Sequence, residues 1–327
     1  MQRVASVNYI VIIITFYKID RRNDFRELKM QLPTIKQLRY FVALAKHKHF
    51  GNAAKSCFVS QSAFSVAIKE LESGLGAQLV DRTKKSVTIT RTGREIANHA
   101  RQCLRDIEYL TELAHSDQKP LTGRLNLGII PTIAPFVLPN LLSKLRQKFP
   151  DLKLYLREDT TRAIHDLLLE GELDLILIAL PFKLSNVEVM PLFKDPFYLA
   201  CHENSKLINP KNYSLDKLPK ESVILLEDGH CLRDHALSAC KIRNQDTVSR
   251  FAASSLLTLV NMVDSDIGIT YLTKMAQNSS LLDNTHIKTY PLEKSSYREI
   301  GLAWRKGSAR EEEFKLLAKV LTDLFSK

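Results

Sequence analysis

Two helical segments joined by a tight turn limit what residues 33–90 can fold into more strongly than any other feature of the sequence. The second segment places Phe64, Ile68 and Leu71 on one face at helical spacing. Another face carries side chains of the types that hydrogen-bond to base edges and phosphates, namely Gln61, Ser62, Ser65 and Lys69. The pattern predicts a helix-turn-helix whose second helix enters the major groove of double-stranded DNA.

Capping residues predict where these helices begin. Thr34 and Gln37 have the spacing of a capping box, and Ser60 stands directly before the second segment. Gly51 should interrupt the helical pattern, and Asn52 is then the expected N-cap of a short helix between the two segments.

A hairpin pattern, LVDRTKKSVTIT, follows the second helix and carries Lys84 and Lys85 at its tip. This is the place of a wing that contacts the DNA backbone. Residues 33–95 hold 11 Lys or Arg against 4 Asp or Glu, which gives +7 of the chain's formal net charge of +11. Such a concentration of positive charge favours a domain that binds nucleic acid over a small helical domain that merely has polar faces.

The segment from Thr92 predicts one long helix with a dimerisation seam. Its apolar residues advance by alternating steps of four and three, the spacing of a two-stranded coiled coil; they are Ile96, Ala100, Cys103, Ile107, Leu110 and Ala114. We expect a homodimer that reads two half-sites, although the seam could instead pack against its own domain. Residues 116–123 have the composition of a linker.

The remainder of the chain alternates strand-like and helical segments. This order predicts an α/β fold with a parallel sheet covered on both faces. Two such halves would leave a ligand-binding cleft at the carboxyl ends of their strands.

Residues 1–32 fit none of these patterns, and we expect them to form an extension outside the fold. A second methionine, Met30, stands just before the first predicted helix. Their apolar run, NYIVIIITFY, is ten residues long, whereas a membrane helix needs about 20, so no membrane partner is expected. The chain contains 5 cysteines, an odd number that favours a reducing, cytoplasmic compartment over a secreted disulfide framework.

The stretch GHCLRDHALSAC holds Cys231 and Cys240, nine positions apart. Positive charge from His230 and Arg233 should lower the pKa of the Cys231 thiol and favour the nucleophilic thiolate, and Asp234 could orient Arg233. The alternatives are inert core cysteines, a structural disulfide, or a metal site that includes His235. The spacing matches no usual metal motif, so we expect neither metal nor cofactor.

Residues 33–327 resemble a LysR-type transcriptional regulator, and GIIPT and LLEDGHCLRD resemble its peroxide-sensing members. The resemblance implies a winged helix-turn-helix at 33–90, a linker helix and hinge at 91–120, and a redox-sensing regulatory domain at 121–327. That domain would have two Rossmann-like subdomains similar to periplasmic binding proteins. The first would comprise about 121–193 plus 299–327, and the second about 194–298.

The resemblance also implies partners and a role. It implies a homodimer that pairs into a dimer of dimers, contact with RNA polymerase, and activation of oxidative-stress genes rather than enzymatic turnover. The signal would be hydrogen peroxide. The alternative within the family is a small metabolite bound in the cleft.

Three further residues join the cysteine site by resemblance alone: Thr132, Thr161 and Arg298. Peroxide would convert Cys231 to a sulfenic acid, and Cys240 would resolve it to a disulfide. If the residues between them are helical, their backbones lie about 13–14 Å apart, whereas a disulfide needs Cα atoms within about 7 Å. The bond would therefore require the segment to refold.

Overall fold

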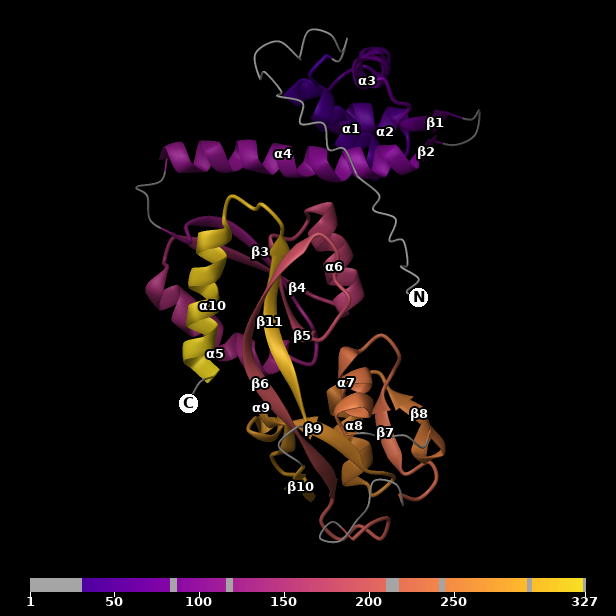
Figure 1. Cartoon of the computed structure of the whole chain (residues 1–327), viewed down its shortest axis with the longest axis vertical. Coiled ribbons are helices and arrows are strands. Elements are labelled where there is room, and N and C mark those ends of the chain that lie inside the picture. The colour runs from indigo at the N-terminus through magenta and orange to yellow at the C-terminus, as the bar shows by residue number, and fades with distance from the viewer. Residues whose placement is uncertain are drawn as a thin grey trace, which may run out of the picture. The chain divides into compact units, whose positions relative to one another are not determined.

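The computed structural model describes residues 31–82, 87–115, 120–209, 218–240, 245–292 and 296–325 (Figure 1). The chain divides into two compact units between Ala100 and Arg101, and each is described by itself. The predicted extension at 1–32 lies outside the described residues apart from its last two.

The first unit contains three short helices, a hairpin and the start of a long helix. In chain order they are α1 (Ile35–His47), α2 (Phe50–Ser56), α3 (Gln61–Leu75), β1 (Val80–Arg82), β2 (Val87–Ile89) and α4 (Arg91–His115). Its core is built around Phe41, Phe64 and Ile68, which are fully buried. The apolar stripe predicted for the second helix therefore faces the core.

The caps are partly as predicted. Thr34 forms the predicted capping box with Gln37, and the Ser60 hydroxyl accepts a hydrogen bond from the first turn of α3. The prediction for α2 is wrong, because the helix begins two residues earlier than Asn52. Its cap is His49, whose ring Nδ1 accepts the Asn52 N–H at 3.2 Å.

The helix α4 begins at Arg91 and runs without a break to His115. Along the predicted seam Ala100 is buried, but Cys103 is exposed and Leu110 is 63% exposed. Part of the apolar seam therefore has no cover within the described residues.

The second unit has a first lobe built on a mixed sheet. Its strands are β3 (Gly123–Ile129), β4 (Leu152–Glu158), β5 (Leu175–Leu180), β6 (Val187–His202) and β11 (Tyr297–Arg305). Strands β4, β3 and β5 are parallel neighbours, and β11 runs antiparallel between β5 and β6. Its helices are α5 (Ala134–Lys148), α6 (Thr161–Glu170) and α10 (Glu311–Phe325).

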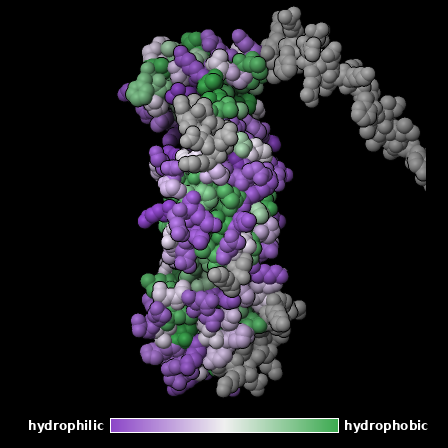
Figure 2. All heavy atoms as spheres, turned by 90° about the vertical axis from the view of Figure 1, so that its left-hand side faces the viewer, coloured by the Kyte–Doolittle hydropathy of each residue, from purple (hydrophilic) through white to green (hydrophobic). Residues whose placement is uncertain are grey.

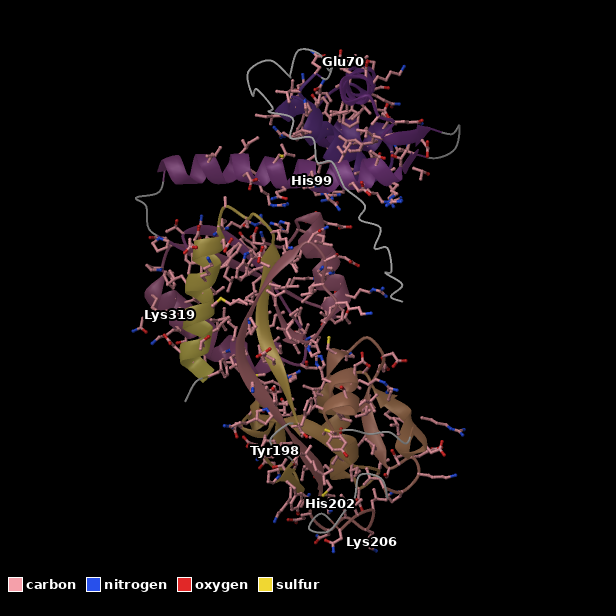
Figure 3. The ribbon with its side chains drawn as sticks, in the orientation of Figure 1. Glu70, His99, Tyr198, His202, Lys206 and Lys319 are labelled. Atoms are coloured by element: carbon pink, nitrogen blue, oxygen red, sulfur yellow. The ribbon has the colours of Figure 1, made fainter. Side chains whose placement is uncertain are left out.

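A second lobe has its own hydrophobic core. It contains β7 (Val223–Leu226), α7 (Cys231–Ala239), β8 (Val248–Ala253), α8 (Leu256–Asp264), β9 (Thr270–Thr273), α9 (Lys274–Gln277) and β10 (Ile287–Pro291), with 3-10 turns at Gln245–Thr247 and Ser280–Leu282. Strand β6 continues into this lobe, where it pairs with β9 and β10, and Tyr198 and His202 mark this end of it (Figure 3).

The α/β fold with two halves is confirmed, but the expectation of a wholly parallel sheet is wrong. The difference arises from β11, which runs antiparallel to both β5 and β6, and from β6, whose 16 residues cross both lobes and pair only antiparallel. A sequence of short apolar runs does not reveal that one strand serves two sheets.

The surface is of an ordinary kind on the face drawn in Figure 2, where hydrophilic residues surround separate hydrophobic patches. None of the helices within the described ranges is both long and apolar enough to cross a membrane.

Candidate functional site

Cys231 and Cys240 lie at opposite ends of α7. Cys231 is the first residue of the helix and Cys240 is its C-cap. Both are free thiols, with exposed fractions of 6% and 1%. Gly229 turns the chain into the helix with a φ of +100°, in the left-handed region that suits glycine. The residues between the cysteines are helical, so a rise of about 1.5 Å per residue places their backbones about 13–14 Å apart.

The hydroxyl of Thr161 is in hydrogen-bond contact with the Cys231 thiol. Thr161 is the first residue of α6 in the first lobe, so this contact joins the two lobes at the Cys231 sulfur. The structure thus brings together two of the residues that the resemblance implied.

Arg298 is fully buried on β11 and is held by three hydrogen bonds. Its Nε donates to Asp195 at 3.0 Å, and its two terminal nitrogens donate to the hydroxyl and the carbonyl oxygen of Thr132 at 2.9 and 2.8 Å. Asp195 also accepts the backbone N–H of Met275 at 3.1 Å. Thr132 therefore anchors Arg298 rather than contacting the thiol.

Asp195 was missed by the sequence reasoning. It is 1% exposed and forms the buried ion pair of Arg298. The clue available in the sequence was an acidic residue within a strand-like apolar run, PLFKDPFYLA, because a buried carboxylate needs a partner.

The two thiols differ in their surroundings. Burial raises the pKa of the Cys231 thiol, while the hydrogen bond from Thr161 and the positive charge of Arg298 act in the opposite direction. Burial alone raises the pKa of Cys240 to about 12. The expected net lowering at Cys231 is thus wrong for this conformation, but only Cys231 has groups that stabilise its thiolate.

Arg233, the fixed positive charge closest to Cys231 in sequence, is not its charged partner in space. Arg233 pairs with Asp228 at 2.9 Å and donates to the Leu226 carbonyl oxygen at 3.3 Å, so the prediction that Asp234 orients it is wrong. A helix that begins at Cys231 turns the side chain two residues later away from the thiol.

Two cavities flank the cysteine helix. One of about 580 Å³ is lined by Cys231 and Asp234 together with His235. The other, of about 490 Å³, lies where the lobes meet and is lined by His230 and Thr132. Across the parts of the chain that the structure describes, no group of three or more His, Cys, Asp or Glu could hold a metal ion.

The helix α3 presents the predicted DNA-reading face. Gln61, Ser62 and Lys69 are exposed, and Ser65 is half-buried. Glu70, labelled in Figure 3, is an exposed acidic neighbour of Lys69 on the same helix. The hairpin of β1 and β2 is confirmed, whereas Lys84 and Lys85 at its tip lie outside the described residues.

Comparison with known proteins gives matches over both units. The bacterial regulatory helix-turn-helix model of the lysR family matches residues 35–94, and the LysR substrate binding domain matches residues 118–326.

Two curated relatives match nearly the whole chain. The HTH-type transcriptional regulator EstR of Acinetobacter baylyi is 40% identical over 89% of this chain and 96% of its own. The DNA-binding transcriptional dual regulator OxyR of Escherichia coli is 37% identical over 88% of this chain and 94% of its own.

Among solved structures, a full-length OxyR variant from Pseudomonas aeruginosa is 34% identical with a TM-score of 0.70, covering 89% of this chain and 98% of that one. These relatives are transcriptional regulators, not enzymes. With a DNA-reading helix-turn-helix in one unit and a two-lobed α/β fold in the other, the chain belongs to the LysR family of DNA-binding transcriptional regulators.

Proposed function

We propose that this regulator senses hydrogen peroxide through Cys231 and Cys240. The observation that carries the proposal is the buried Cys231 thiol in contact with the Thr161 hydroxyl, near the buried charge of Arg298, with a second thiol at the far end of the same helix. A relative of 37% identity over 88% of this chain, the hydrogen peroxide-inducible genes activator of Escherichia coli O6:H1, supports it.

The chemistry follows from these groups. The Cys231 thiolate attacks one oxygen of the peroxide, the O–O bond breaks, and sulfur becomes a sulfenic acid as hydroxide leaves. The Thr161 hydroxyl can donate a hydrogen bond to the peroxide oxygens, and Arg298 favours the negative charge that develops. The Cys240 thiolate then attacks the sulfenic sulfur, which releases hydroxide and forms the disulfide.

The second step requires α7 to open. A disulfide needs Cα atoms within about 7 Å, well below the rise of a nine-residue helix. Opening breaks two contacts that fix the helix: Ser296 to the Ala239 carbonyl oxygen at 3.1 Å, and His235 to the Pro181 carbonyl oxygen at 3.0 Å. It also withdraws Leu232 and Cys240 from the core of the second lobe. Oxidation would therefore remodel this lobe.

The test compares reduced and peroxide-treated protein on the same promoter DNA. We expect a Cys231–Cys240 cross-link by mass spectrometry and a changed footprint. Identical footprints with only unlinked thiols would contradict the proposal.

We further propose that the two lobes are the predicted subdomains and that α4 forms the homodimer seam. Leu110 and Cys103 on that seam are exposed in the single chain. A second copy of α4 would cover them.

Leu110→Glu is expected to weaken self-association by at least about tenfold, because it places a charge in an apolar seam; this corresponds to about 1.4 kcal/mol. Analytical ultracentrifugation measures the effect. Ile267→Glu changes a comparably exposed side chain, at 57% against 63%, and should leave association unchanged. Equal effects of the two variants would place the dimer contact elsewhere.

Lys69→Ala is expected to weaken binding to all DNA sequences and to reduce the slope of log affinity against log salt by about 0.9, the loss of one phosphate contact. Fluorescence anisotropy at several salt concentrations measures the slope. Lys153→Ala removes an exposed lysine of β4 and should leave it unchanged. An unaltered slope in the Lys69 variant would remove this residue from the interface.

A second candidate function is binding of a small metabolite in the cavity of about 490 Å³ between the lobes. Its lining combines apolar groups such as Phe136 and Leu256 with Ser254 and His230, the mixture that small-ligand sites use. A regulator of this kind would still respond to its ligand after Cys231 is replaced by another residue.

A further inference from the structure

His235 is a buried titratable side chain that the proposed chemistry does not use. It follows Cys231 by four residues on α7, so the two side chains share one face of the helix. Both line the cavity of about 580 Å³. His235 is 8% exposed.

The hydrogen bonding of the ring fixes its tautomer. Its Nε2 lies 3.0 Å from the carbonyl oxygen of Pro181, which can only accept, so Nε2 carries the hydrogen. In the neutral ring Nδ1 is then an acceptor. That atom is fully buried and has no hydrogen-bond partner among the described residues. Leaving a buried acceptor without a hydrogen bond is unfavourable, so the site favours a donor that reaches Nδ1.

We propose that Nδ1 of His235 is the base that takes the thiol proton of Cys231. The two groups are not hydrogen-bonded in this conformation and Nδ1 has no solvent access, so a side-chain rotation on the shared face of α7 brings the thiol to the base. Proton transfer gives a thiolate and an imidazolium. The thiolate forms the S–O bond with one peroxide oxygen as the O–O bond breaks. The departing hydroxide takes the proton back from the imidazolium, so one thiol and one peroxide yield one sulfenic acid and one water, and His235 ends neutral.

The surroundings keep the base in its neutral form. Burial lowers the pKa of His235 and Arg298 on β11 adds to this, while the Pro181 carbonyl and the neighbouring Asp234 oppose it. Tyr297 and Glu299 of β11 line the same cavity. A neutral imidazole beside a thiol is the resting state that a base mechanism requires.

The inference rests on the proposed peroxide function, and its test separates the two. In a Cys240→Ser background, which stops at the sulfenic acid, the second-order rate of Cys231 oxidation is measured by dimedone trapping between about pH 5 and about pH 9. With His235 as base, the oxidation rate is independent of pH between the pKa of His235 and the pKa of the Cys231 thiol. The rate decreases as the pH drops below the pKa of His235.

His235→Gln keeps an amide that can donate to Pro181 but removes the base. In this variant only pre-formed thiolate reacts, so the rate should rise about tenfold per pH unit throughout the same interval, and at pH 7 it should be at least about tenfold below the parent. Ser238→Ala, in the same cavity, should keep the level profile. Thermal unfolding followed by circular dichroism verifies that each variant is folded.

The outcomes are distinct. If the parent forms no adduct at Cys231, the proposed peroxide function fails. If the parent reacts and the Gln variant shows a profile of the same shape, shifted or not, His235 does not act as the base. A purely structural role would alter the level of the rates but not their dependence on pH.

Discussion

Cys231→Ser is expected to abolish the response to peroxide completely: no change of footprint, no cross-link and no change in promoter output. The serine hydroxyl cannot supply a nucleophilic anion at neutral pH and cannot form a disulfide. Because the hydroxyl can still meet Thr161, the reduced fold and its DNA binding should persist. Footprinting before and after peroxide, with mass spectrometry of the same samples, measures the effect.

The matched control is Cys201→Ser. Cys201 is also a buried free thiol, on β6 in the second lobe, and burial also raises its pKa. It has no place in the proposed chemistry, so its loss should leave the response intact. A Cys231→Ser protein that still responded to peroxide would refute the sensing role. A variant that responded to a small metabolite instead would favour ligand binding in the cavity between the lobes.

Cys240→Ser separates the two chemical steps. It should still accumulate sulfenic acid at Cys231 but form no cross-link. The order of reaction follows from the environments of the two thiols. Only Cys231 has a hydrogen-bonding hydroxyl and a nearby cation that favour its anion, whereas burial holds the pKa of Cys240 at about 12. Cys240 becomes a competent thiolate only after α7 opens and water reaches it.

The features that the sequence predicted well depend on neighbours a few residues apart. The apolar stripe through Phe64 and Ile68 and the Ser60 cap each follow from helical spacing over one to three turns. The LysR resemblance then brought Thr161 to the thiol, a contact across 70 positions that no local pattern contains.

The features that could not be predicted depend on which distant segments meet. Arg233 is two residues from Cys231 but pairs with Asp228, because helical geometry directs it away. Arg298 and Asp195 are 103 positions apart, and they meet only because β11 and β6 pair antiparallel. The capping role of His49 at the start of α2 was not predicted, because histidine rarely caps a helix.

Asp195→Asn is expected to destabilise the second unit by about 3–5 kcal/mol, because it leaves the Arg298 charge buried without a counter-charge. Both side chains are almost fully buried, at 1% and 0% exposed, so water cannot replace the lost carboxylate. The chain's one tryptophan, Trp304, is buried in the first lobe of this unit, and its fluorescence during urea unfolding reports on that lobe.

Two further variants decide whether this effect comes from the buried charge. Glu95→Gln breaks the Arg91–Glu95 pair, whose side chains are 90% and 64% exposed, and exposed pairs of this type contribute at most about 1 kcal/mol. Replacing both buried partners, with Asp195→Leu and Arg298→Met, should recover part of the loss, because apolar groups of similar size need no counter-charge. If the double variant is less stable than Asp195→Asn alone, the hydrogen bonds of Arg298 to Thr132, and not the ion pair, make the larger contribution to stability at this site.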